Sequence, residues 1–111
     1  MEFPVRYLEG GIAVLQLEGT INIMREAAVR DAIASLVSQG HHRVVVDLAS
    51  VSFLDSAGLG ALIGGLKAAR QAGGDLRISG PRQQVQLVLS LTNMDTVLPP
   101  YLVPEDAFPD V

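Results

Sequence analysis

The sequence of 111 residues contains no cysteine. That absence excludes a disulfide framework, a thiolate nucleophile and cysteine-based zinc sites. Basic residues are also few. The chain has eight lysines and arginines and twelve aspartates and glutamates, which gives a formal net charge of -4. An acidic chain of this kind is not expected to bind nucleic acid or anionic membrane surfaces through charge.

Long apolar runs are missing as well. Charges and glycines interrupt every apolar run well before the roughly 20 residues that a membrane helix needs. The N-terminus lacks the basic segment and apolar core of a secretory signal. We therefore expect a cytoplasmic protein with no direct membrane insertion. Length and composition, with 49% hydrophobic residues, fit a single globular domain over residues 1–111.

The N-terminal part of the chain predicts a β-hairpin. Two short runs with apolar content, 5–9 and 12–18, flank Gly10-Gly11, a dipeptide typical of a hairpin turn. In the second run the apolar residues alternate, which predicts one buried face, and Gly19 is expected to end the strand.

Helices and strands alternate after the hairpin. Asn22 suits the N-cap of a first helix, whose apolar residues recur at helical spacing until Gly40. The β-branched run 44–46 is typical of a central strand covered on both faces. A second helix is predicted from about Ser56 to Gly73-Gly74, and a strand over 76–79 follows.

The last third of the chain predicts one more helix and one more strand. Pro81 suits the first position of the helix, and Val97-Leu98 is expected to form a last strand or an extended segment. Prolines predict an irregular tail over about 104–111. The whole order predicts an α/β fold: a mixed, mostly parallel sheet of four to five strands with helices packed on it.

The most informative segment runs from Val44 to Gly60. It predicts a buried strand, a short turn, an exposed Asp55-Ser56 pair and a helix. Capping alone explains the pair, since aspartate and serine are preferred caps. A serine at this position can also carry a phosphate, because free backbone N–H groups and the helix dipole favour negative charge there.

Two glycines, Gly58 and Gly60, lie in the opening turns of this predicted helix. Each costs about 1 kcal/mol relative to alanine in a helix interior, so a reason other than helix stability is needed. One reason is close packing of the helix on the sheet, and another is close approach of a partner's backbone or of a nucleotide. Leu59, between them, is expected to be partly exposed and to offer a partner an apolar contact.

The ordered combination of these residues resembles the signature of the STAS domain, specifically of the bacterial anti-sigma factor antagonists (anti-anti-sigma factors). The matching positions are Asp47-Leu48, Val51, Phe53, Asp55-Ser56 and Gly58-Leu59-Gly60, followed by an apolar helix. The resemblance extends over nearly the whole chain. It implies a single STAS domain that acts in transcription regulation and stress response as a binding protein, not as an enzyme, and without a cofactor.

The resemblance also implies a partner-switching cycle with Ser56 as the phosphorylation site. The unphosphorylated protein would bind an anti-sigma factor that is also a serine kinase, and the sigma factor would be released. Phosphorylation would end the binding, and a metal-dependent serine phosphatase would restore it. The implied partner-binding residues are Asn22, Asp55, Ser56, Ala57, Gly58, Leu59 and Gly60.

Two positions depart from the family pattern. Asn22 stands where the family has an acidic residue near the phosphorylation site, and Ala57 stands where serine or threonine is common. The first change removes one negative charge, and the second leaves Ser56 as the only hydroxyl of the pair.

The sequence is also compared with three other interpretations of the same residues: a scaffold, a hydrolase and a metal site. A STAS scaffold or an accessory subunit of a membrane lipid transport complex, without a phosphorylation cycle, remains an alternative because of Asn22. A small hydrolase with Ser56 as nucleophile is disfavoured, since no histidine stands where it can be paired with the serine. A metal site at His41-His42 is disfavoured too, because sequence neighbours in a loop point in different directions.

Overall fold

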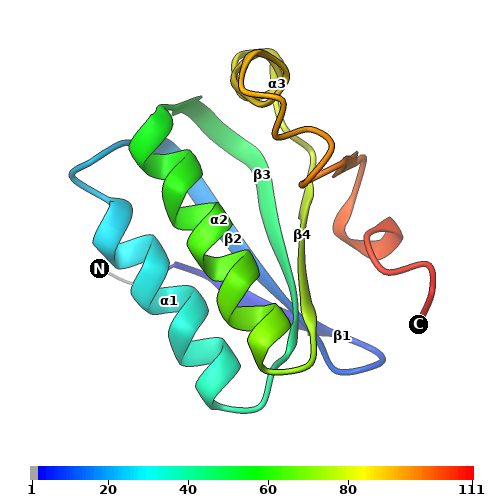
Figure 1. The fold of residues 1–111 in the computed structure, drawn as a ribbon. Helices are drawn as coiled ribbons and strands as arrows, with labels where there is room; N and C mark the ends of the chain where they lie inside the picture. The colour runs from blue at the N-terminus through cyan, green and yellow to red at the C-terminus, as the bar shows by residue number, and fades with distance from the viewer. Residues whose placement is uncertain (1–2) are drawn as a thin grey trace.

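The computed structural model describes residues 3–111. In that range the elements follow the predicted alternation of strands and helices (Figure 1). Their bounds are β1 (Val5–Leu8), β2 (Ile12–Ile21), α1 (Glu26–Ser38), β3 (Arg43–Leu54), α2 (Ser56–Gln71), β4 (Asp75–Ser79), α3 (Gln83–Leu91), β5 (Pro100–Tyr101) and the 3-10 helix η1 (Pro104–Asp106).

One mixed sheet holds the five strands in the order β1-β2-β3-β4-β5. The β1–β2 hairpin is antiparallel, and the other three pairs are parallel. Each connection between two parallel neighbours contains a helix, namely α1, α2 or α3. Parallel strands need such a crossover because a tight turn cannot join them. The predicted α/β fold with a mostly parallel sheet and an N-terminal hairpin is confirmed.

The sheet is covered on both faces. The larger core lies under α1 and α2, which lie side by side on one face (Figure 1). It includes the alternate residues Ala13, Leu15 and Leu17 of β2, which confirms the predicted buried face. A second cluster on the other face joins Ile12, Val14 and Val45 to Ala107 and Phe108 near the C-terminus. The run 44–46 is therefore covered on both faces, as predicted.

Both central strands are longer than expected. Gly19 does not end β2; it adopts a φ of +73°, and the strand continues to Ile21 after two register shifts against β3. A glycine that tolerates positive φ lets a strand absorb such an irregularity without ending. The short turn expected before Asp55 is also absent, because pairing with β2 extends β3 to Leu54.

The first helix starts later than expected. Asn22 is not its N-cap: the Asn22 Oδ1 atom accepts a hydrogen bond from the Met24 N–H at 3.0 Å, and its carbonyl accepts one from the Arg25 N–H at 3.0 Å. Asn22 therefore closes a turn, a common use of asparagine, and α1 begins at Glu26. The predicted stop at Gly40, with φ of +95°, is correct to within two residues of the helix end.

Near the C-terminus, the start of α3 and the position of the last strand differ from the prediction. Pro81 precedes the extended Arg82, which is the N-cap of α3. Val97 and Leu98 are not in a strand, because both donate their N–H groups to the Met94 carbonyl in a turn. The strand β5 follows at Pro100–Tyr101.

The predicted irregular tail has a structural role. Of residues 104–111, Ala107 and Phe108 are buried against the sheet face that the main helices do not cover. The single turn η1 brings them there. Within residues 3–111, none of the helices combines the length and apolar character that a membrane span requires.

Candidate functional site

The candidate site lies where β2 and β3 end together. Ile21 is aligned with Leu54 in the sheet, and the Asp55 N–H donates to the Ile21 carbonyl at 3.3 Å. The segments that follow the two strands therefore start side by side, and the turn containing Asn22 lies at the same end of the domain as the start of α2 (Figure 1). The structure thus brings together the predicted residues from both segments.

Asp55 is the N-cap of α2. Its backbone is extended, with φ of -104° and ψ of -173°, and its Oδ1 atom accepts a hydrogen bond from the Gly58 N–H at 2.9 Å. The predicted cap is confirmed for Asp55. Ser56 is then the first helical residue, and it is exposed. Its hydroxyl is accessible at a helix end where backbone N–H groups favour an anion.

The two glycines have different surroundings. A Cβ atom on Gly58 would lie 2.5 Å from the Ile21 carbonyl oxygen and 2.7 Å from the Leu54 Cδ1 atom. On Gly60 the nearest atom would be Arg30 Nη2 at 3.6 Å, an ordinary contact. Close packing of the helix on the sheet therefore explains Gly58. It does not explain Gly60, which is half-buried and has the Arg30 guanidinium as its nearest neighbour.

Leu59 is buried, with 6% of its surface exposed, so the expected partial exposure is wrong. It belongs to the core-facing side of α2, together with Leu62 and Leu66. Gly58 is buried as well. Gly58 and Leu59 are therefore not accessible to a partner and act only by packing α2 on the sheet. Ser56 is exposed, and the other predicted residues are partly accessible: Asn22, Asp55, Ala57 and Gly60.

We expect Gly58→Ala to lower the free energy of unfolding by about 1 to 2 kcal/mol, because overpacking costs more than the gain in helix propensity returns. Gly60→Ala has only the gain in helix propensity, so it should raise stability by up to about 1 kcal/mol. Urea denaturation of both variants measures the two changes. Equal effects at the two positions would show that the contacts of Gly58 do not decide its identity.

Sequence reasoning missed three exposed apolar residues near the ends of β2 and β3, at the end of the domain where α2 begins. Ile23 and Met24, in the turn after β2, expose 70% and 84% of their surfaces, and Phe53 in β3 exposes 44%. Phe53 is aligned with Thr20 near the end of β2. Periodicity could not have identified these residues as exposed. The only available signal was their position next to the predicted ends of the strands.

Gln84 of α3 holds the backbone just before the Asp55-Ser56 pair. Its Oε1 atom accepts from the Leu54 N–H at 2.9 Å, and its Nε2 atom donates to the Leu54 carbonyl at 3.1 Å. The pairing of β4 with β3 ends at Asp47, so this side of β3 lacks a strand neighbour at Leu54. Gln84 replaces that neighbour and fixes the position of the site.

The alternative chemistries find little support at this end of the domain. His41 and His42 precede β3, whereas Ser56 follows it, so the strand separates them from the serine. The part of the chain that the structure describes contains no group of three histidine, cysteine or acidic side chains placed to hold a metal ion.

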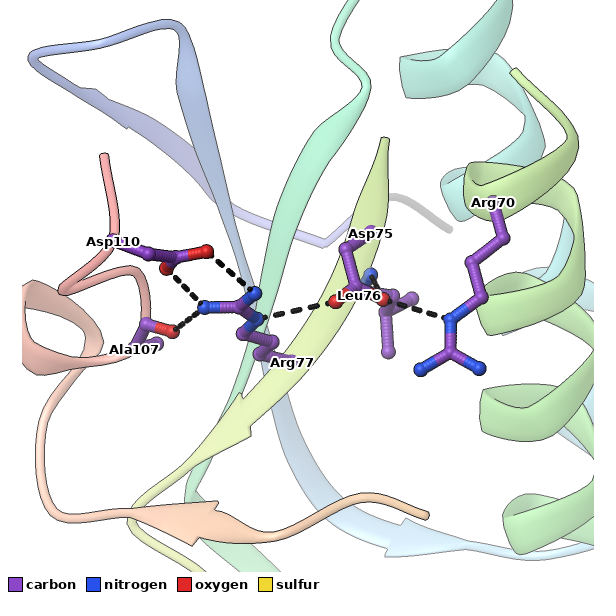
Figure 2. Close-up of polar contacts among 6 residues, drawn as sticks. All are labelled: Arg70, Asp75, Leu76, Arg77, Ala107 and Asp110. Atoms are coloured by element: carbon purple, nitrogen blue, oxygen red, sulfur yellow. Dashed lines mark hydrogen bonds and ion pairs between the residues drawn. The ribbon is translucent and has the colours of Figure 1, made fainter. Parts of the chain in front are cut away.

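The strongest charge cluster lies away from the site, at the C-terminal segment (Figure 2). Arg77 Nη1 donates to Asp110 Oδ1 at 2.7 Å and to the Ala107 carbonyl at 2.9 Å, and Nε donates to Asp75 Oδ2 at 3.2 Å. The guanidinium carbon lies 4.2 Å from the centre of the Phe108 ring. Arg77 therefore links residues 107–110 to β4 through hydrogen bonds and an ion pair.

This cluster shifts the protonation of its members. The hydrogen bond from Arg77 lowers the pKa of Asp110, and the same bond raises the pKa of Arg77. Glu105 pairs with Arg6 and not with Arg77. Its pKa is also lowered, first by a hydrogen bond from its own backbone N–H and then by the Arg6 guanidinium. The lowered pKa values favour the charged forms of Glu105 and Asp110.

The attachment of Asp110 should survive to lower pH than an ordinary carboxylate would allow. Its folded pKa is lowered, so its contribution to stability is present above the unfolded pKa of about 3.9 and is lost as pH falls through the folded value. Carboxyl carbon shifts in an NMR titration measure this pKa. In Arg77→Met the Asp110 pKa should return toward 3.9, and an unchanged value would contradict the assigned cause.

The chain matches the STAS domain family over residues 4–107. It is 27% identical over 84 residues to an anti-sigma-B factor antagonist of Staphylococcus epidermidis, a match that covers 76% of this chain and 78% of that protein. It is also 26% identical to the crystal structure of an anti-sigma factor antagonist from Mycobacterium paratuberculosis, with a TM-score of 0.85 over 98% of this chain and 92% of that one.

A further solved structure, SpoIIAA of Bacillus in its phosphorylated form, shares the fold. The TM-score is 0.71 at 18% identity, and the match covers 94% of both chains. These relatives bear out the resemblance stated from the motif, and with it the expectation of a regulatory binding protein rather than an enzyme. The fold, the capped Asp55-Ser56 motif and the match over residues 4–107 agree, and the chain belongs to the STAS domain family.

Proposed function

We propose that this protein is an anti-sigma factor antagonist whose binding is switched off by phosphorylation of Ser56. The observation that carries the proposal is the exposed Ser56 hydroxyl at the first position of α2, beside an aspartate already engaged as the cap. The names of the relatives support the general role. The phosphorylated form of SpoIIAA supports a phosphorylation cycle in a protein of the same fold.

In this proposal the binding surface consists of Ser56 and of the exposed apolar residues Ile23, Met24 and Phe53 at the same end of the domain. Exposed apolar residues that gather at one end of a domain are typical of a protein interface. In this proposal the unphosphorylated protein places that surface on an anti-sigma factor, and the sigma factor is released.

The switch is a phosphoryl transfer. The anti-sigma factor, acting as a serine kinase, transfers the γ-phosphoryl group of ATP to Ser56 Oγ; ADP leaves, and a base of the kinase takes the hydroxyl proton. A metal-dependent phosphatase reverses the state: water attacks phosphorus, inorganic phosphate leaves and the serine hydroxyl is restored. The phosphate adds about -1.5 to -2 charges in the middle of the interface.

The fold itself should not change on phosphorylation. Asp55 remains the cap through its bond to the Gly58 N–H, and the end of α2 favours the added negative charge. The complex is lost because the phosphate is bulky, strongly hydrated and next to the Asp55 carboxylate. Asn22 carries no charge, so it adds nothing to this repulsion.

The proposal is tested by incubating the protein with its candidate anti-sigma kinase, ATP and magnesium and recording the intact mass. We expect a gain of one phosphate, about 80 Da, in the wild type and none in Ser56→Ala. No gain, with a complex that still forms on a sizing column, would replace the switch by a constitutive STAS scaffold. No gain and no complex would refute the antagonist function for this pair.

A further inference from the structure

An arginine of α1 lies on the face of α2 that carries Ser56. Ser56, Gly60 and Gly64 follow one another at intervals of four residues, so they share one side of the helix. Arg30 Nη2 lies 3.6 Å from the position of a Cβ atom on Gly60, and Nη1 lies against the corresponding position on Gly64. Because neither glycine has a side chain, the Arg30 guanidinium can lie directly against α2 at these two positions.

The rest of the Arg30 side chain is only loosely fixed. Its Nε atom donates to Glu26 Oε1 at 2.9 Å, an i,i+4 pair on α1, and 45% of the side chain is exposed. An exposed pair of this kind contributes little to stability, so a more highly charged acceptor can compete for the guanidinium. By contrast, Arg25 donates to the Glu18 carbonyl at 3.1 Å and lies over the Phe3 ring, which directs it elsewhere.

We propose that Arg30 is the intramolecular counter-charge of phosphorylated Ser56. The inference rests on the proposed function. The Cβ positions of residues 56 and 60 are about 5 to 6 Å apart, and the Arg30 guanidinium already lies beside the second of them. A phosphate on Ser56 then lies within reach of a small movement of the guanidinium, whose two Nη groups bind phosphate oxygens as a pair.

The negative groups that face the same position oppose this contact. Asp55 lies next to Ser56 but is engaged with the Gly58 N–H, and Glu26 holds Arg30 Nε. Phosphorylation therefore sets the phosphate and Glu26 in competition for one arginine. Arg30 partly neutralises the phosphate within the monomer, so the phosphorylated form is stabilised after it leaves its partner.

The test measures the second pKa of phosphoserine, ordinarily about 6, by a phosphorus-31 NMR titration. Phosphoserine is incorporated at position 56 during translation, so no kinase is needed. We expect Arg30→Gln to raise this pKa by about 0.5 unit relative to the wild type, because a nearby cation favours the dianion. Glu26→Gln should lower it, since it removes a negative charge and releases Arg30.

Arg70→Gln is the matched control. It removes the same charge from an exposed arginine near the other end of α2, about 20 Å along the helix axis from Ser56. Screening at ordinary salt should leave the phosphoserine pKa unchanged in this variant. Equal pKa values in Arg30→Gln and Arg70→Gln would overturn the proposal. Failure of the kinase experiment would not, because this protein carries its phosphate from synthesis.

Discussion

Ser56→Asp should weaken binding of the anti-sigma factor by at least about 100-fold, or about 2.7 kcal/mol. The substitution places a carboxylate at the exposed start of α2, beside the Asp55 carboxylate and in the middle of the proposed binding surface. In the complex this charge would lose its water without gaining a partner. The free protein should remain folded, because a negative charge in the first turn of a helix is favourable.

Isothermal titration calorimetry with the purified anti-sigma factor measures the change. Ser56→Ala should bind nearly as the wild type does, since it removes the hydroxyl but adds no charge. Ser38→Asp adds the same charge at the exposed last residue of α1, at the opposite end of the helical layer, and should leave the affinity unchanged. Equal losses in the Ser38 and Ser56 variants would place the interface elsewhere.

Phe108→Ala should lower the free energy of unfolding by about 3 kcal/mol, the lower end of the range for buried aromatic residues. Phe108 is 6% exposed and packs with Ile12, Val14 and Val45 on the sheet face away from α1 and α2. Its removal leaves a cavity there and takes away the ring under the Arg77 guanidinium. The loss of both contacts makes this the largest stability effect that we expect in the C-terminal segment.

Urea denaturation followed by circular dichroism measures that loss. Val111→Ala, at a side chain that is 54% exposed, is the control and should change stability by less than about 0.5 kcal/mol. A loss below 1 kcal/mol for Phe108→Ala would show that residues 104–111 do not cover the sheet in solution.

The order of elements and most of the core could be predicted from the sequence, because both depend on local periodicity. Alternation in β2 placed Ala13, Leu15 and Leu17 on one face, and helical spacing placed Val29 and Ile33 in the core. The Asp55 cap was also predictable, since capping is a contact within four residues of the chain.

Features that depend on distant parts of the chain could not be predicted. The end of β3 at Leu54 is set by pairing with β2 and by the Gln84 side chain, 30 residues away in sequence. The difference between Gly58 and Gly60 requires knowing that Ile21 lies under one of them. Nothing in residues 104–111 indicated that Phe108 would complete the second face of the sheet.

The burial of Leu59 illustrates the same limit within the site. Its position near a helix start suggested exposure, but the tight contact of Gly58 with β2 draws this turn of α2 onto the sheet. Ile23 and Met24, which the Asn22 cap would have placed in the first turn of a helix, lie in the turn before α1 and are exposed instead. The exposed part of the site is therefore built from the β2–α1 turn as much as from α2.

The most direct test of the account is a sigma-release measurement with a fluorescent sigma factor bound to its anti-sigma factor. Unphosphorylated protein should release the labelled sigma factor in proportion to its concentration, and protein carrying phosphoserine at position 56 should release almost none. Equal release by the two forms would contradict the central claim that the phosphorylation state of Ser56 decides binding.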